Sequence, residues 1–438
     1  TLNLGMRWAV IGGLVEVAGR IAGFDRGLPN PAAGGRQGAL TFVNQQGRRG
    51  FQDTYWNQIS PKFGFAYAAT EKMVIRGGYG INNAPPIMNG FGFPDTFGFN
   101  GSIAVNQNNT QLRFAEEPVM QLSGRYPDLG ITLPNTDPSQ ANGQGVNYIA
   151  RDSNRLAYTQ NWNFGIQYQL PANTLLEVNY IGNKGTRLEA NGLDNLNALP
   201  TSMLSMGNIL DTQWSPASGI PEPFAGFRGT VAQALRPYPQ YTNVGQVFAN
   251  FGTSTYNSLQ TQVTHRFRSG LSFLGAYTWS KAIALSNSAI DAIPAADLFN
   301  RSLERSITDF HIPHFLKLTW IYELPIGPGK AVNVNGILNH VIGGWQLTAN
   351  HQIRSGTPLS IGTGGITNPF GTARADRVNG VDVVVDPSAP INFRGASGGA
   401  VYLNRAAFTN PPVHPGGRNV ITRPGTLGPR LPDVRNRH

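Results

Sequence analysis

The sequence contains no cysteine among its 438 residues, which excludes disulfide bridges and thiolate metal sites. Charged residues are also scarce, at 13% of the chain against about 25% in an average soluble protein. No stretch approaches about 18 uninterrupted apolar residues, so the sequence predicts no transmembrane helix. The first residues show no secretory signal, and we expect any export signal to lie outside this sequence.

Glycine and aromatic residues are abundant instead, with 53 Gly, 23 Phe, 14 Tyr and 7 Trp. A chain that is rich in these residues and poor in charge is typical of a membrane β-protein or a secreted β-protein. The formal net charge of +10 is compatible with an acidic partner. Because no run of five or more Lys or Arg occurs, we expect no nucleic-acid partner, whereas phosphorylated lipids or periplasmic anions fit the scattered charge.

Apolar residues recur at every second position in many segments, and this period of two predicts β-strands. Several runs reach about ten residues, the length that a tilted strand needs to cross a bilayer. One side of each run is apolar and the other carries mostly amides or hydroxyls. Nine strands are predicted, at residues 1–10, 63–67, 73–81, 158–169, 174–181, 256–267, 271–279, 316–324 and 345–353.

The connections between these strands alternate between short and long. The short ones, at 68–71, 170–173 and 268–270, predict tight hairpins on one rim. The connection 325–344 is longer but belongs to the same side, and its part 332–342 is expected to add a short helix or an irregular strand. The long connections are polar and rich in Pro, Gly and Asn, and they cover 11–58, 82–157, 182–255 and 282–313. Short turns on one rim and long loops on the other are typical of a transmembrane barrel.

Residues capable of chemistry do not form a recognisable site. His311 and His314 are three apart, but Pro313 disfavours the helix that would direct both at one metal. Gly329 and Lys330 end a weak likeness to a phosphate-binding loop, which we interpret as a turn. Acidic residues in the predicted loops show no metal-ligand spacing: Glu116, Glu117, Asp291, Asp297 and Asp309. We therefore expect no enzyme activity, no metal and no cofactor.

Several strands and their flanks resemble the Oar-like TonB-dependent transporters. The most specific block runs from Tyr256 to Ala282 and includes Tyr277-Thr278-Trp279-Ser280-Lys281-Ala282. The other segments that carry the resemblance are 60–67, 74–80, 160–167, 177–185, 322–325, 343–347 and 355–358. The resemblance extends to about residue 360, and residues 361–438 form a loop-rich tail that loses the family's pattern.

The resemblance implies an outer-membrane protein that moves a large solute with energy from the TonB complex. Such a transporter has a plug and a barrel of about 22 strands, so nine strands make less than half of the wall. We therefore expect an all-β, antiparallel transmembrane β-barrel segment of roughly nine to ten strands, incomplete, with long extracellular loops. Its implied partners are outer-membrane lipid, the TonB complex and an unknown solute. Residues 1–438 alone are expected neither to close a pore nor to transport.

The alternation also predicts which side chains face lipid or the aromatic girdles at the membrane surfaces, whereas Lys317, Thr319 and Glu323 are expected to face the lumen. The alternative is a soluble secreted β-protein that binds carbohydrate with its exposed aromatic residues, and it would purify without detergent. The lipid-facing or girdle candidates are Leu2, Leu4, Trp8, Trp162, Phe164, Phe273, Tyr277, Trp279, Leu316, Leu318, Trp320, Tyr322 and Trp345.

Overall fold

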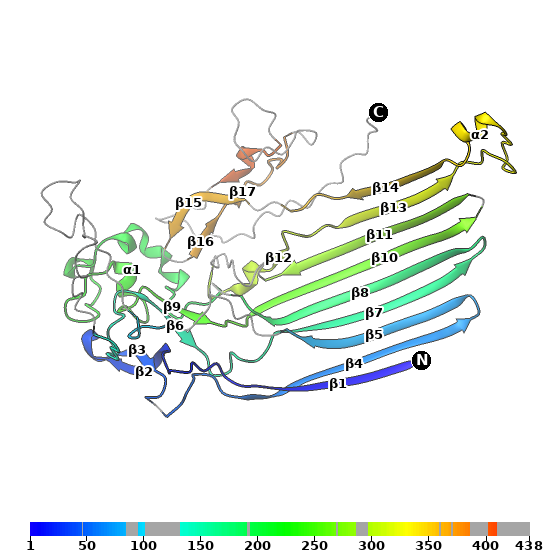
Figure 1. The fold of residues 1–438 in the computed structure, drawn as a ribbon. Helices are drawn as coiled ribbons and strands as arrows, with labels where there is room; N and C mark the ends of the chain where they lie inside the picture. The colour runs from blue at the N-terminus through cyan, green and yellow to red at the C-terminus, as the bar shows by residue number, and fades with distance from the viewer. Residues whose placement is uncertain are drawn as a thin grey trace, which may run out of the picture.

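The computed structural model describes residues 1–45, 47–84, 95–100, 132–190, 193–268, 270–285, 297–358, 361–368, 371–385 and 402–409. Its main feature is one sheet of ten strands, nine of which follow each other in chain order with every neighbouring pair antiparallel (Figure 1). The short strand β12 (Ser306–Ile307) pairs with the end of β11. The nine are β1 (Leu2–Ile11), β4 (Tyr55–Thr70), β5 (Met73–Asn83), β7 (Tyr158–Leu170), β8 (Thr174–Leu188), β10 (Gly252–Arg268), β11 (Leu271–Ala284), β13 (His314–Glu323) and β14 (Gln346–Arg354).

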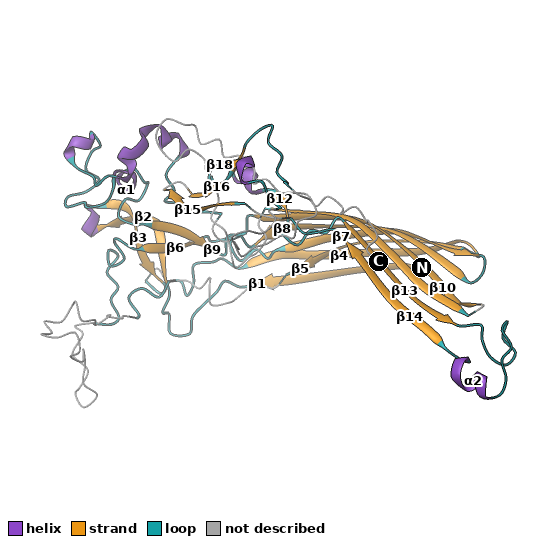
Figure 2. Ribbon diagram, turned by 90° about the horizontal axis from the view of Figure 1, so that it is seen from above, coloured by secondary structure: helices purple, strands orange, loops and turns teal. Residues whose placement is uncertain are grey.

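All nine strands that the period of two predicts are present, which confirms the predicted antiparallel all-β fold. Several run further than the pattern indicates, because β4 has 16 residues and β10 has 17. A tilted strand needs about 9–11 residues to cross a bilayer. The longest strands therefore have enough length to extend past a membrane. The sheet is curved, and β1 and β14 are its two edge strands (Figure 2).

The β4–β5, β7–β8 and β10–β11 hairpins lie on the same rim, as the short connections predict (Figure 1). Their turns are shorter than expected, since β4 continues to Thr70, β7 to Leu170 and β10 to Arg268. Ala172 and Asn173 both have positive φ angles, which closes the second hairpin within three residues. The β13–β14 connection lies on this rim too and contains α2 (Ile337–Ile342), so the helix is the one of the two expected alternatives that is present.

The opposite rim carries structure that the sequence pattern does not reveal. The predicted long loops contain two small sheets, the antiparallel pair β2 (Ala22–Asn30) and β3 (Arg36–Phe42) and the parallel pair β6 (Gly145–Ile149) and β9 (Asn243–Val247). We call residues 12–54, 132–157 and 189–251, as far as they are described, the loop-side module (Figure 1). Its helices are η1 (Pro31–Ala33), η3 (Thr201–Asp211), η4 (Pro216–Ser218) and α1 (Val231–Ala234).

The loop-side module has its own buried core, which draws residues from three long connections. Phe24, Phe42 and Tyr241 are almost completely buried in it, with Phe24 packed edge-on against Tyr241. The buried Asn30 side chain ties the same three connections together: its amide nitrogen donates to Tyr241 Oη at 3.2 Å, and its carbonyl accepts from Ser139 Oγ at 2.9 Å. Burial raises the pKa of Tyr241 to about 12. These connections therefore form a packed unit, not open loops.

The remaining described elements are short. Two small two-stranded antiparallel sheets, β15–β16 and β17–β18, follow β14, and η5 precedes β12. That the tail begins at residue 361 stays a prediction, and residues 410–438 of the tail lie outside the described residues. The elements are η5 (Arg301–Glu304), β15 (Gly362–Asn368), β16 (Gly371–Arg374), β17 (Asp376–Arg377), η6 (Arg405–Ala407) and β18 (Phe408–Thr409). In the described part of the chain, no helix has the length and apolar character needed to span a membrane.

Candidate functional site

The strand register places most of the large apolar residues of the nine strands on one face of the sheet, and a few, such as Ile181, Phe315 and Ile321, on the other. Residues that are paired across antiparallel strands project to the same face. Next to a largely apolar row on the side of the hairpin turns, one complete row passes from strand to strand through eight strands. Its members are Leu2, Phe65, Gly77, Phe164, Tyr180, Leu259, Trp279 and His314. We call this side the apolar face.

Twelve of the predicted lipid-facing or girdle residues lie in strands, and the register assigns all twelve to the apolar face. They are Leu2, Leu4, Trp8, Trp162, Phe164, Phe273, Tyr277, Trp279, Leu316, Leu318, Trp320 and Tyr322. The thirteenth, Trp345, immediately precedes β14, and its indole nitrogen donates to the carbonyl of Val341 at 2.7 Å. The shared face is thus established, whereas its contact with lipid stays a prediction.

Large apolar side chains on this face are exposed. Leu4 is 75% exposed, Trp8 61% and Trp279 55%. Soluble monomers rarely expose a contiguous apolar patch beyond a few hundred Å². A face of this kind over nine strands therefore needs an apolar environment.

The opposite side, the polar face, carries amides, hydroxyls and charges. Arg76 connects two strands there, because its Nη2 donates to Gln167 Oε1 at 2.6 Å and to Glu177 Oε1 at 2.8 Å. Gln262 Nε2 adds a bond of 3.3 Å to the other carboxylate oxygen. The network therefore links β5, β7, β8 and β10 by side chains. Lys317, Thr319 and Glu323 are on this face, as the alternation predicts.

Three histidines on the apolar face form contacts that sequence reasoning missed. His265 stacks on Phe273 with ring centroids 5.4 Å apart. His314 stacks on Tyr277 and His351 on Trp320, and each of these pairs also shares a hydrogen bond. Each pair joins neighbouring strands, so the strand register is the signal that reveals it.

The two histidines considered as metal ligands, His311 and His314, lie in different surroundings. His314 belongs to the sheet, whereas His311 is buried beside the end of β11 and its Nδ1 accepts from the N–H of Ala282 at 3.3 Å. Within the described ranges, no group of three His, Asp or Glu residues is arranged to hold a metal. Glu116, Glu117 and Asp291 lie outside the described residues.

The remaining residues considered for chemistry have structural contacts. Asp297 caps a turn by accepting from the N–H of Phe299 at 2.8 Å. Lys330 lies in a turn, as predicted, and pairs with Glu323 at 3.2 Å.

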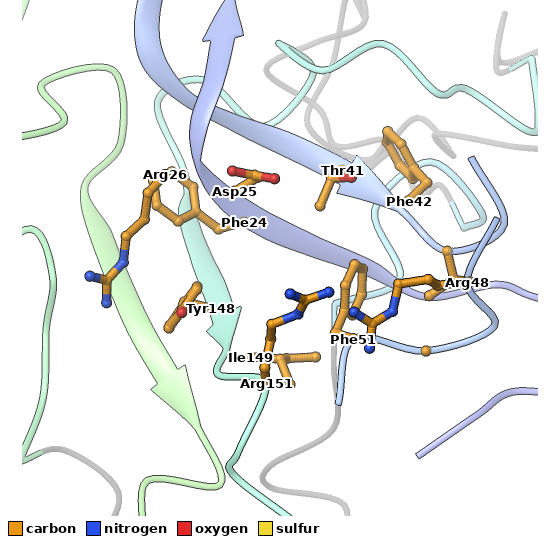
Figure 3. A pocket seen from close by; sticks show the side chains of 12 residues that line it. Phe24, Asp25, Arg26, Thr41, Phe42, Arg48, Phe51, Tyr148, Ile149 and Arg151 are labelled. Carbon is orange, nitrogen blue, oxygen red and sulfur yellow. The ribbon is translucent and has the colours of Figure 1, made fainter. Parts of the chain in front are cut away.

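A cleft of about 380 Å³ lies in the loop-side module (Figure 3). Arg26 lies over the ring of Tyr148 at 4.5 Å, and Arg48 and Arg151 both pair with Asp53. Aromatic rings and guanidinium groups are suited to contacts with planar and anionic groups. The side chains labelled in Figure 3 are Phe24, Asp25, Arg26, Thr41, Phe42, Arg48, Phe51, Tyr148, Ile149 and Arg151.

The sequence matches a known protein family. Residues 1–428 match the family described as "Outer membrane beta barrel domain". No curated protein matches the chain in sequence.

Three solved structures illustrate the similarity that a structural comparison finds. The FrpB iron transporter from Neisseria meningitidis is 11% identical, with 73% of this chain and 30% of that chain covered and a TM-score of 0.32. The outer membrane transporter YddB from Escherichia coli is 9% identical, with coverages of 73% and 35% and a TM-score of 0.32. The ferripyoverdine receptor of Pseudomonas aeruginosa is 8% identical, with coverages of 76% and 26% and a TM-score of 0.30. The chain thus spans about a third or less of these proteins.

The family assignment rests on the sequence match over nearly the whole chain, and the curved antiparallel sheet is an open segment of the kind of wall that such a barrel has. The chain belongs to the outer membrane beta barrel domain family and is a component of the cell outer membrane.

Proposed function

We propose that the chain forms part of the wall of an Oar-like TonB-dependent transporter, which moves a large solute across the outer membrane. The observation that carries this proposal is the two-faced sheet, with an apolar face continuous over nine strands and a polar face behind it. A sheet with lipid on one side and an aqueous lumen on the other requires this division. The TonB complex would supply the energy.

The two rims support the proposal as well. Three hairpins with turns of three residues or fewer and the longer β13–β14 connection occupy one rim, which suits the periplasmic side. The loop-side module occupies the other rim, which suits the cell exterior. The cleft in that module offers guanidinium groups and aromatic rings to a solute that arrives from outside. We assign no catalytic role to any residue.

The alternative of a secreted carbohydrate-binding protein gains no support. Its basis was the set of exposed aromatic residues, and these lie on the continuous apolar face among aliphatic residues such as Leu4 and Leu318. The family match is likewise to an outer-membrane domain.

Membrane residence is tested by fractionating cells that produce the full-length protein. We expect it in the outer-membrane fraction, resistant to carbonate extraction and soluble only with detergent. Recovery in the periplasm or culture supernatant without detergent would contradict the proposal.

Coupling is tested by comparing cells with and without TonB. Labelled ferric chelates, oligosaccharides and peptides are offered, and uptake is compared with that of cells lacking the protein. We expect uptake of a solute that requires both the protein and TonB. Protein-dependent uptake at the same rate without TonB would show a passive pore instead.

A further inference from the structure

The two faces of the sheet differ in how they carry charge. Among the register-paired strand residues whose side chains the structure describes, the apolar face has two formal charges, and both are lysines: Lys184 and Lys281. The polar face carries both signs, at Arg7, Lys62, Arg76, Glu177, Lys317, Glu323 and Arg354. A charge on a lipid-facing surface is costly at the bilayer midplane and tolerated near the interface. The positions of the two lysines along their strands are therefore informative.

Both lysines lie at the same level of the wall. Lys184 is ten residues after Thr174, the first residue of β8, and Lys281 is ten residues after Leu271, the first residue of β11. Ten residues of strand cover about 33 Å. With a tilt of about 40°, this corresponds to a height of about 25 Å, which is the usual height of the apolar band of an outer-membrane barrel. The lysines thus stand where the band ends on the side of the loop-side module.

The lysines also flank a single strand. Lys184 pairs with Thr255 of β10, and Lys281 pairs with Asn257 of the same strand. Two strand spacings and a two-residue offset place their Cα atoms about 12 Å apart. Because both side chains are long, flexible and exposed, their ammonium groups can converge on one anionic group above β10.

Asn257 lies between the two lysines, and the three polar residues are on the loop side of the nearest tryptophan rings. Tyr180 donates its hydroxyl to Asn257 Oδ1 at 2.7 Å, so the amide nitrogen is the end of Asn257 that meets a ligand. Two residues nearer the hairpin turns, Trp162 of β7 pairs with Gly182 of β8 and Trp279 precedes Lys281 on β11, at a level where indole rings settle at a membrane interface. Neither lysine has an ion pair within the described ranges.

From this placement we propose that Lys184, Lys281 and Asn257 form a site for the phosphate group of a lipid in the outer leaflet. The proposal rests on the proposed function, because it requires the apolar face to lie against lipid and the loop-side module to lie outside. The charge of these three residues is positive, and among the described strand residues of this face no carboxylate offsets it, so an anionic headgroup complements it. The acyl chains of the same lipid would pack below, against the apolar face near Tyr180 and Leu259.

The test is native mass spectrometry of the full-length protein, extracted from outer membranes in a mild detergent. The probes are bisphosphorylated lipid A, the same lipid without its phosphates, and inorganic phosphate. The double variant Lys184→Gln/Lys281→Gln is compared with Lys62→Gln/Lys317→Gln, which removes the same charge from the polar face. Heat-modifiable gel migration verifies that both variants fold.

We expect the first double variant to bind bisphosphorylated lipid A more weakly by on the order of 30-fold, since each lysine near an anionic surface contributes a factor of about five to six in affinity. The control variant should bind as the wild type does. Equal losses in both variants, unchanged binding in the first, or equal binding of the dephosphorylated lipid would each overturn the site. If inorganic phosphate binds saturably and competes with the lipid, the ligand of the site is free phosphate and the proposal of a lipid ligand is wrong. If one of these outcomes is obtained while the protein still fractionates with the outer membrane, the lipid site is wrong but the proposed function is not contradicted.

Discussion

Substituting Leu318 by Arg tests the assignment of the apolar face at its centre. Leu318 is the fifth of the ten residues of β13, and it pairs with Gly275 on one side and His351 on the other. Its side chain leans over Gly275, where a methyl group would meet Leu318 Cδ1 at 3.7 Å. An arginine at this place would leave its guanidinium in the middle of the apolar band.

The expected cost of Leu318→Arg is about 2–4 kcal/mol, the range for Arg at the bilayer midplane of an outer-membrane barrel. Thr319 is the next residue and lies on the polar face, so Thr319→Arg should cost less than about 1 kcal/mol. The difference of at least about 1 kcal/mol corresponds to a factor of at least about five in the folding equilibrium.

Equilibrium unfolding of the full-length protein in guanidinium chloride, after refolding into liposomes, measures both costs. Folded protein is recognised by heat-modifiable gel migration and tryptophan fluorescence. Equal small losses for the two variants, or a larger loss for Thr319→Arg, would refute the reasoning.

Three further predictions follow from single contacts. The indole of Trp162 covers Gly182, so Gly182→Ala should destabilise by about 1–3 kcal/mol and shift tryptophan emission, whereas Gly275→Ala has room and should do neither, in the same unfolding assay. Asn30→Ala should cost about 1–3 kcal/mol by orphaning the polar groups around it, and protease sensitivity of the loop-side module should rise. Burial, and secondarily the charge of Lys281, lowers the pKa of His311. The unfolded state then binds the proton more readily, so local stability should fall as pH drops below about 6.5, seen as faster amide exchange near His311.

The nine-stranded sheet could be predicted from the sequence because each strand carries its own signal. In β13, for example, Leu316, Leu318 and Trp320 alternate with polar residues, and this alternation depends on no distant segment. The rim that carries the hairpin turns could likewise be predicted, from the short connections between strands. The predicted turns were one or two residues too long, because Thr70 and Arg268 are polar and do not continue the apolar alternation that marks the strands.

The loop-side module could not be predicted because its contacts are non-local. β6 and β9 are five-residue strands that pair in parallel although about 100 residues separate them. Strands so short carry too little alternation to be recognised, and nothing in the sequence states which partner they take. The hydrogen bonds of the Asn30 side chain could not be predicted either, because they join residues more than 100 positions apart.

The register of the sheet also lies beyond sequence reasoning. That Lys184 and Lys281 both flank β10, or that His351 stacks on Trp320, follows from how the strands align and not from any one strand. The pocket residues Arg26, Arg48 and Arg151 were missed likewise, since three separate segments bring them together.

The central claim is that the apolar face lies against lipid and the polar face against water. Because the chain has no native cysteine, single cysteines can be placed at each position from 315 to 322 and labelled with a nitroxide in the full-length protein in liposomes. Collision rates with oxygen and with a water-soluble nickel chelate are then measured by power saturation. The account predicts a period of two, with oxygen access highest at Leu316, Leu318, Trp320 and Tyr322 and chelate access highest at the residues between them. A scan without alternation, or with its phase reversed, would contradict the account.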